Sequence, residues 1–258
     1  LLELHHASLD AELRDKLVGS LVLLRRKEII DSTALLDTLW PLLLNTPSKS
    51  LRELLFTKII SDLRTSNAKG TNHKLNRHMQ SKCFELVASD SASPKGLWSV
   101  KITRELWKRQ VWTEAKAVAV MKEAALSQDA KVVTGGVRFF LGGDQEREEA
   151  AAEEDQDDEG HVDVKRLKHV AGINKELKNA AKAVKKQERK KNAPQQLNFS
   201  ALHLLHDPQG FAETLFERHL QPAQPKVKLN LDQKLLVLQL VSRLVGLHKL
   251  TLIPLYSY

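Results

Sequence analysis

The chain has 258 residues, of which 42% are hydrophobic and only 5% aromatic, so a sizeable core in one or two domains can form. Leucine supplies most of the apolar content, and this composition favours helix. The formal charge of +8 indicates an anionic partner, with nucleic acid as the first candidate. A single cysteine, Cys83, excludes an internal disulfide and fits a reducing compartment.

The sequence begins at Leu1 and stops at Tyr258, just after a strongly apolar stretch. We therefore expect it to be an internal piece of a longer protein. The longest apolar region, residues 235–256, is interrupted by basic and histidine side chains. It is typical of a buried helix and its successor, and we predict no membrane span.

Amphipathic helices succeed one another over residues 1–143. Leucines at steps of three and four predict a first helix around residues 13–24. Asp31 or Ser32 can cap a second helix, which we expect to bend or break at Pro41. Apolar spacing and proline placement predict further helices over residues 51–63, over residues 75–86, from Pro94 onward, and over residues 113–126 and 129–140.

No segment shows a sustained alternation of apolar and polar residues, so the sequence predicts no strand. Short turns join the helices in pairs of about 40 residues, a spacing typical of HEAT and armadillo repeats. We therefore predict an all-α fold, an α-solenoid of HEAT- or armadillo-like repeats interrupted by a charged flexible insertion. A globular helical bundle is the alternative, because residue identity between the units is weak.

Composition changes sharply over residues 144–193. Residues 144–159 hold ten acidic side chains against one basic, whereas residues 165–191 hold eleven basic against two acidic. Such a segment buries too little apolar surface to offset its ordering entropy, so we expect a linker that is largely disordered or partly helical. The two charges, −9 and +9, cancel, so the net +8 comes from the rest of the chain.

The helical pattern returns over residues 194–258, which we interpret as a continuation of the repeats. Asp207 and Pro208 look like the cap and first residue of one helix. Asp232 is predicted to start another, which is apolar on most sides, as expected for a helix buried between neighbours.

We find no catalytic constellation, cofactor motif or metal-ligand set. His203 and His206 are three residues apart, but zinc needs three or four ligands and no partner set has suitable spacing. Cys83 lies in a leucine-rich stripe, which favours a small buried side chain over a nucleophile. The pairs 135–136 and 142–143 are glycines without a phosphate-loop context, so we expect close helix packing at the first and a helix end at the second.

Basic side chains in the helical part form the candidate nucleic-acid site. Lys74 and Arg77 project away from the apolar stripe of the predicted helix over residues 75–86, behind a loop that contains Lys69, and the other three share a face of the following helix. Cations fixed on helices in this way can neutralise RNA phosphates. A solvated surface is the alternative for each of them. The candidates are Lys69, Lys74, Arg77, Lys101, Arg104 and Lys108.

A second basic cluster has the composition of a nuclear localisation signal. Its residues are Lys185, Lys186, Arg189, Lys190 and Lys191. By contrast, we interpret Trp98, Trp107 and Trp112 as core and interface residues and not as base-stacking platforms.

Long ordered stretches resemble a known eukaryotic family, called severe depolymerization of actin. They are LVGSLVLLRRKEIID (17–31), SKSLRELLFTKIISDLR (48–64), NHKLNR (72–77), KVVTGGVRFFLGGDQEREE (131–149), KKNAPQQLNFSALHLLHDPQGFAETLF (190–216) and QKLLVLQLVSRLVGLHKLTLIPLYSY (233–258). These stretches cover nearly the whole chain apart from the charged linker, which departs in detail.

The resemblance implies a nuclear, nucleolar and nucleoplasmic factor for maturation and export of the pre-60S large ribosomal subunit. Its implied partners are pre-ribosomal RNA, ribosomal proteins and assembly factors near the 5S ribonucleoprotein, with no membrane, small-molecule substrate, cofactor or catalytic residue. The competing hypothesis is a nuclear transport or actin-cytoskeleton adaptor solenoid without direct RNA contact. An enzyme is the third class, and it would require titratable groups that the sequence does not supply.

Overall fold

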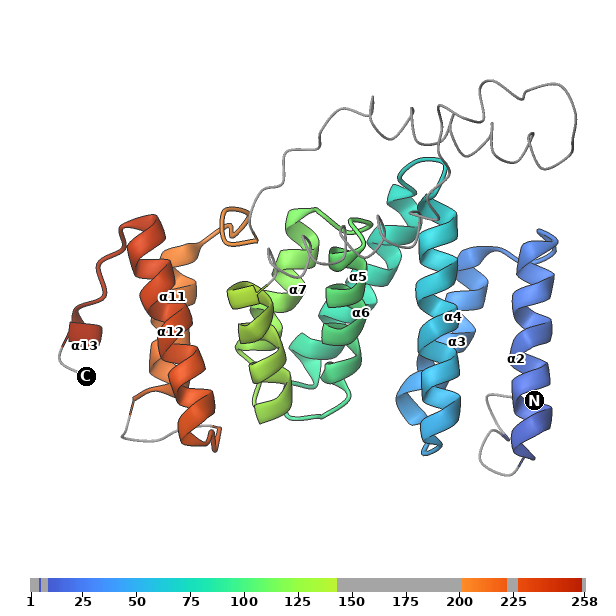
Figure 1. Ribbon diagram of the computed structural model, residues 1–258, viewed down its shortest axis with the longest axis horizontal. Helices are drawn as coiled ribbons and strands as arrows, with labels where there is room; N and C mark the ends of the chain where they lie inside the picture. The colour runs from blue at the N-terminus through green and yellow to red at the C-terminus, as the bar shows by residue number, and fades with distance from the viewer. Residues whose placement is uncertain (1–4, 6–8, 143–200, 222–226, 257–258) are drawn as a thin grey trace, which may run out of the picture.

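The computed structural model describes residues 5, 9–142, 201–221 and 227–256, and within them the regular structure is helical, with no strand. A helix without a label in Figure 1 spans residues 130–142. The helices stand side by side in one row, from α2 at one end to α12 and α13 at the other (Figure 1). The labelled helices are α2 (Ala11–Arg26), α3 (Ser32–Asn45), α4 (Lys49–Asn67), α5 (His73–Ser89), α6 (Gly96–Lys108), α7 (Ala115–Ala125), α11 (Pro208–His219), α12 (Leu231–His248) and α13 (Ile253–Tyr256).

The helices are arranged in two layers. In one layer α2 contacts α4, and α4 contacts α6; in the other layer α3 contacts α5, and α5 contacts α7. Helices consecutive in sequence, such as α3 with α4 and α5 with α6, pack across the layers. Stacked helix pairs of this kind define an α-solenoid. The predicted all-α solenoid of HEAT-like repeats is therefore confirmed.

Side-chain caps set where several helices begin. Asp31 accepts a hydrogen bond from the amide of Ser32 at 2.8 Å, and Asp207 accepts one from the amide of Gly210 at 2.9 Å. Pro208 is the first residue of α11, where its missing amide hydrogen is not needed. These starts agree with the sequence prediction.

Helix α12 begins with a reciprocal capping box. The side chain of Asn230 accepts from the amide of Gln233 at 2.8 Å, and the Gln233 side chain accepts from the amide of Asn230 at 3.0 Å. The first helical residue is thus Leu231, one residue before the predicted Asp232. The two bonds satisfy amide groups that a helix start leaves without partners.

The sequence predicts a bend or break at Pro41, but helix α3 continues through this residue to Asn45, so the helix does not break there. Trp40, Leu42 and Leu43 around the proline are 5%, 2% and 0% exposed. An internal proline costs about 3 kcal/mol, whereas burying one large apolar side chain stabilises by about 1.5–3 kcal/mol. Burial of the three neighbours therefore outweighs the proline.

Helix α6 begins at Gly96, two residues later than predicted, and Pro94 lies in the preceding turn. A Cβ atom at Gly96 would meet the Val132 side chain at 3.5 Å, which places the start of α6 beside the helix of residues 130–142.

The first glycine pair allows the close helix packing that the sequence predicted. A Cβ atom at Gly136 would lie 2.6 Å from the backbone nitrogen of Ala125, and one at Gly135 would lie 2.8 Å from Val100 Cγ1. Only glycine leaves room for these approaches. The pair therefore holds the helix of residues 130–142 against both α6 and α7. The end of this helix at the second glycine pair stays a prediction, because Gly143 lies outside the described residues.

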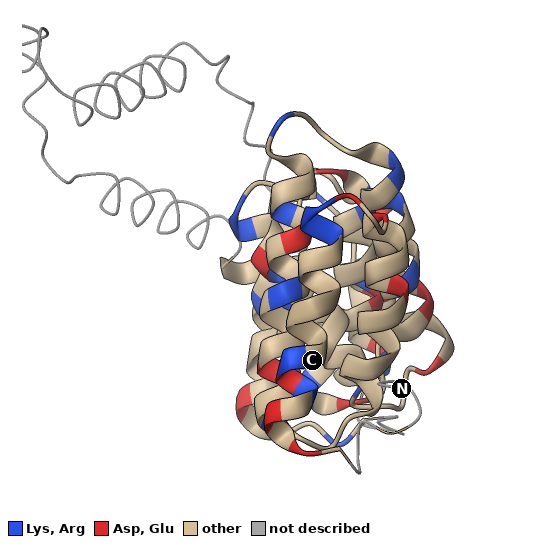
Figure 2. Cartoon of the chain, turned by 90° about the vertical axis from the view of Figure 1, so that its right-hand side faces the viewer, with Lys and Arg blue, Asp and Glu red and all other residues tan. Residues whose placement is uncertain are grey.

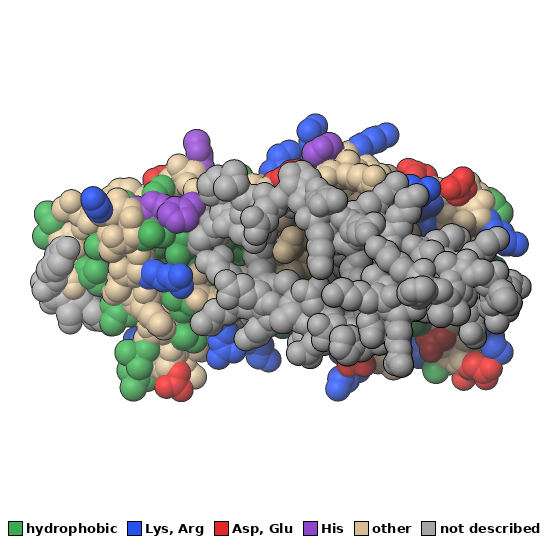
Figure 3. Space-filling model, turned by 45° about the horizontal axis from the view of Figure 1, so that its top comes forward, with side chains coloured by type: hydrophobic (Ala, Val, Ile, Leu, Met, Phe, Trp, Pro, Cys, Tyr) green, Lys and Arg blue, Asp and Glu red, His purple; other side chains and the backbone are tan. Residues whose placement is uncertain are grey.

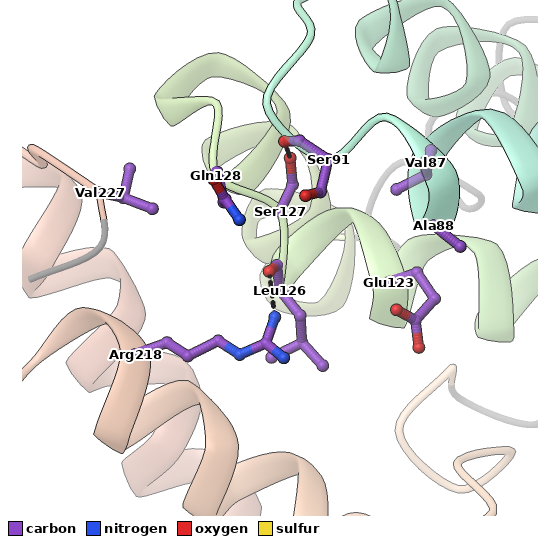
Figure 4. A pocket seen from close by; sticks show the side chains of 9 residues that line it. All are labelled: Val87, Ala88, Ser91, Glu123, Leu126, Ser127, Gln128, Arg218 and Val227. Atoms are coloured by element: carbon purple, nitrogen blue, oxygen red, sulfur yellow. Dashed lines mark hydrogen bonds between the residues drawn. The ribbon is translucent and has the colours of Figure 1, made fainter.

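The two helical segments pack directly against each other across the α7–α11 junction. Arg218 Nη1 donates to the carbonyl oxygen of Leu126 at 2.7 Å, and the ring of Phe140 lies 5.4 Å from that of Phe211. Figure 4 shows the Arg218 side chain reaching from α11 to the end of α7 across a small polar pocket. The predicted flexible linker of residues 144–193 lies outside the described residues.

Trp107 and Trp112 pack in the hydrophobic core, as predicted. Trp107 and Trp112 are each 1% exposed, and the ring of Trp107 stacks edge-on against Phe139 at a centroid distance of 5.2 Å. No helix in the described part of the chain is both long and apolar enough to span a membrane.

Candidate nucleic-acid interface

Three of the predicted cations surround the turn between α4 and α5. Helix α4 ends at Asn67 and α5 begins at His73. Lys69 lies in the turn, and Lys74 and Arg77 lie on the first turns of α5, all three exposed. The structure thus brings this part of the predicted site together.

A network of amide hydrogen bonds fixes that turn. The amide of Asn72 donates to Asn67 Oδ1 at 2.8 Å, and the Asn72 side chain caps α5 by accepting from the amide of Leu75 at 3.1 Å. Asn76 lies one turn into α5, and its Oδ1 accepts from Trp112 Nε1 at 3.2 Å. Because the backbone is held in this way, the basic side chains start from fixed positions.

The other three cations occupy the outer face of α6. Lys101 and Arg104 are exposed and Lys108 is half-buried, while the residues at positions 99, 103 and 106 on the opposite side are buried. Lys101 Nζ lies 4.4 Å from the centroid of the Trp98 ring, a cation–π contact. This contact orients Lys101 along the helix surface and leaves its charge exposed to solvent.

The six predicted residues do not form one patch. Helix α5 lies in the layer of α3 and α7, and α6 lies in the layer of α4, so their outer faces point in opposite directions. Lys74 and Arg77 therefore face away from Lys101 and Arg104. Basic residues occur on both sides of the stack in Figure 2, and Lys and Arg side chains reach both long margins of the view in Figure 3.

The face of α6 continues onto the helix of residues 130–142, whose two exposed cations were not among the predicted site residues. Lys131 and Arg138 are exposed on the helix of residues 130–142, which packs beside α6 through Gly135. Their spacing of seven residues places them on one side of that helix. We call the five cations on these two helices the α6 ridge: Lys101, Arg104, Lys108, Lys131 and Arg138.

The spacing of Lys131 and Arg138 can be read from the sequence, but their position beside α6 cannot.

Arg243 of α12 extends the positive charge further, because its Nη1 donates to the carbonyl oxygen of Leu141 at 3.0 Å. This guanidinium thereby lies beside the helix of residues 130–142.

Two acidic groups near the basic surfaces, Glu105 and Asp37, are paired. On α6, Glu105 Oε1 accepts from Arg109 Nε at 2.6 Å. On the α5 side, Asp37 of α3 binds His78 Nε2 at 2.7 Å and Lys82 Nζ at 2.6 Å. Burial raises the pKa of Asp37, but the hydrogen bonds from Lys82 and His78 outweigh burial, so its pKa lies below the ordinary value. Asp37 thus stays charged and offsets the charge of Lys82 on the α5 side.

Cys83 and the pair His203 and His206, which the sequence singled out, belong to no metal-binding cluster in the described part of the chain. Cys83 is fully buried, as predicted, and burial raises the pKa of its thiol to about 12, so the thiolate is not formed near neutral pH. His203 is exposed with its ring 6.1 Å from that of His248. Among the described residues, no group of three or more His, Cys, Asp or Glu side chains could hold a metal ion.

The predicted nuclear localisation residues, Lys185 to Lys191, lie outside the described residues. Their role stays a prediction.

Known proteins match this chain over its whole length. The family model described as SDA1, HEAT repeat, matches residues 1–258. The chain belongs to the SDA1 family. The family resemblance inferred from the sequence stretches is thereby confirmed.

The SDA1 relatives come from distant eukaryotes. Protein SDA1 of Chaetomium thermophilum is 61% identical over 265 residues, which cover 100% of this chain and 34% of that protein. Protein sda1 of Schizosaccharomyces pombe is 46% identical, with 100% and 39% covered. The SDA1 homologue of Drosophila melanogaster is 37% identical, with 100% and 36% covered. The chain thus spans little more than a third of the length of these SDA1 proteins.

Proposed function

We propose that this chain is the helical-repeat part of a non-enzymatic assembly factor of the pre-60S large ribosomal subunit. It is required for maturation and nuclear export of that particle, and it acts in the nucleolus and nucleoplasm. Its partners are pre-ribosomal RNA, ribosomal proteins and assembly factors near the 5S ribonucleoprotein. Membership of the SDA1 family supports this proposal, together with the resemblance described above.

The α6 ridge is the observation that carries the RNA-binding part of the proposal. Lys101 and Lys108 are seven residues apart, which corresponds to about 10 Å along the helix axis. Lys131 and Arg138 repeat this spacing on the adjacent helix, so cations stand in two parallel rows. Folded RNA is recognised mainly through shape and phosphate positions, for which fixed cations are suited.

The mechanism we propose is scaffolding. Two packed layers of helices hold the ridge at a defined geometry, so binding does not require a mobile segment to become ordered. RNA phosphates bind at the ridge, while other faces contact assembly proteins. The proposal assigns no catalytic residue and no cofactor.

Crosslinking in cells tests the proposal. Ultraviolet crosslinking of the full-length protein should yield uridine adducts on α6 and on the helix of residues 130–142. The charge reversal Lys101→Glu, Arg104→Glu, Lys108→Glu should remove these adducts and weaken co-sedimentation with pre-60S particles. Circular dichroism and thermal unfolding should show that the helices of this variant remain folded.

The matched control reverses the charges on the opposite face, Lys74→Glu with Arg77→Glu. We expect a smaller loss of co-sedimentation, because this variant reverses only two of the predicted cations and Asp37 already pairs with Lys82 on that face. Protein crosslinks without any uridine adduct would favour the transport or cytoskeletal adaptor instead. Unchanged co-sedimentation of the α6 variant would refute the assignment to the ridge.

A further inference from the structure

An open groove of about 440 Å³ runs between α4 and α6. Its floor is apolar and includes Phe56, Ile60 and Ala68 of α4. Arg64 of α4 and Arg109, just after α6, lie at the same end as Ala68. Phe56 and Ala68 are twelve positions apart, which corresponds to about 18 Å along a helix axis. That length accommodates five or so residues of extended chain, or about three turns of a helix.

The groove combines an apolar floor with a positive rim. Arg64 and Arg109 line it, and Lys101 and Lys108 lie on α6 four residues before and three residues after the lining residue Glu105. Glu105 also lines the groove, but its carboxylate pairs with Arg109 at 2.6 Å. The lining thus holds two arginines and one glutamate, and the two lysines add positive charge on the same helix as that glutamate.

We propose that this groove binds a peptide segment of another protein, in which aliphatic or aromatic side chains are interspersed with acidic residues. The apolar side chains fill the floor, and the carboxylates face the cations of the rim. Apolar contact supplies affinity and complementary charge sets the direction and selectivity of binding. This partner is distinct from the RNA of the proposed function, and the inference does not depend on it.

RNA fits the groove itself less well than it fits the outer ridge. The rings of Phe56 and Trp98 pack against each other with centroids 6.0 Å apart, and the Lys101 ammonium covers Trp98 at 4.4 Å. These contacts occupy ring faces on which bases would stack. An apolar floor rewards aliphatic side chains, which RNA lacks.

Phage display supplies the peptide used as the binding probe. Random peptides of about 15 residues are selected for binding to the whole chain. We expect the selected sequences to be acidic, with apolar residues three or four positions apart. A synthetic, fluorescently labelled copy of the tightest peptide is then titrated by anisotropy. Ser61→Glu is the blocking variant, because Ser61 is exposed on α4 and lines the groove.

Ser61→Glu places a like charge against the peptide, so its Kd should rise at least tenfold, equivalent to about 1.4 kcal/mol. Ser81→Glu is the matched control, since Ser81 is an exposed serine within α5 in the other layer. It should leave the Kd within about twofold, because it adds the same charge away from the groove.

Several results would overturn the inference. They are the absence of any peptide above background, selection of basic peptides, or equal binding by the chain and by Ser61→Glu. Uridine crosslinks on Phe56 or Trp98 would assign the groove to RNA, and self-association abolished by Ser61→Glu would assign it to a second copy. RNA binding is tested separately with the α6 ridge variant. A failure of the proposed function can therefore be distinguished from a failure of the peptide-groove inference.

Discussion

Asn67 and Asn76 exchange a pair of amide hydrogen bonds across the junction of α4 and α5. Asn67 Nδ2 donates to Asn76 Oδ1 at 2.9 Å, and Asn76 Nδ2 donates to Asn67 Oδ1 at 2.8 Å. Asn76 is only 3% exposed, and its Oδ1 also accepts from the indole of Trp112. One side chain thus connects α4, α5 and the turn that follows α6.

Replacing Asn76 should destabilise the folded chain. Asn76→Ala leaves the buried indole of Trp112 without its acceptor, which costs about 1–3 kcal/mol. It also removes both side-chain hydrogen bonds to Asn67, whose Nδ2 keeps its bond to the carbonyl oxygen of Leu63. We expect the free energy of unfolding in urea to fall by about 2–4 kcal/mol. Ser81→Ala, on an exposed surface, should change it by less than about 0.5 kcal/mol. Equal effects of the two substitutions would show that the network contributes nothing.

Two helical glycines should respond to alanine with opposite signs. Gly136→Ala forces a methyl group to within 2.6 Å of the Ala125 backbone, so we expect a loss of about 1–3 kcal/mol or more in unfolding free energy. Gly246 lies in the interior of α12, and a Cβ atom there meets nothing within 4 Å. Gly246→Ala should therefore stabilise by about 0.5–1 kcal/mol. Thermal unfolding of both variants measures this contrast, and a stable Gly136→Ala protein would disprove the close packing.

The stability of the α7–α11 junction should depend on pH through His219. This side chain is 1% exposed, and its Nε2 binds the carbonyl oxygen of Ala125 at 2.9 Å, while its Nδ1 is buried without a partner among the described residues. Burial lowers the pKa of His219 below its ordinary 6.5, although the bond to Ala125 opposes this effect. The folded chain therefore favours the neutral ring.

Because the unfolded chain takes up this proton near the ordinary pKa of 6.5, acidification favours unfolding. The contribution of the neutral His219 ring to the free energy of unfolding is fully present above pH 6.5. It is lost as the pH falls towards the lower folded-state pKa, by up to about 1.4 kcal/mol per pH unit. His219→Gln should be less stable near neutral pH but should lose less on acidification. Urea unfolding of both proteins across this range checks the difference, and parallel curves would contradict the assignment.

The α6 ridge should account for most of the salt dependence of RNA binding. Neutralising Lys101, Arg104 and Lys108 to Gln should lower the slope of log K against log salt by about 2–3, since each phosphate contact contributes about 0.7–0.9. Lys74→Gln with Arg77→Gln, on the other face, should change the slope by less than about 1. Binding of an RNA hairpin at several salt concentrations measures both slopes. Equal reductions would mean that RNA contacts both faces.

Local chemistry made much of the fold readable from the sequence. Apolar spacing located the helices, and the side chains of Asp31 and Asp207 marked two of their starts, because these signals act within one or two turns of the chain. The glycines at 135 and 136 indicated close packing for the same reason. Pro41 misled the prediction, since its local cost is offset by burial against other helices.

The candidate site was only partly readable. Sequence spacing correctly placed Lys101, Arg104 and Lys108 on one side of α6. It could not show that Lys74 and Arg77 face the opposite way, nor that Lys131 and Arg138 stand on the helix next to α6. Which helices become neighbours depends on contacts between residues distant in sequence.

The sequence by itself determined that this protein is helical, where most helices lie and that it carries excess positive charge. These properties follow from composition and from the period of 3.6 residues that each helix imposes on its own side chains. Only the tertiary structure decided which cations share a surface and where a groove opens between α4 and α6. Consecutive helices lie in opposite layers, so the order along the chain does not give the order of charges around the molecule.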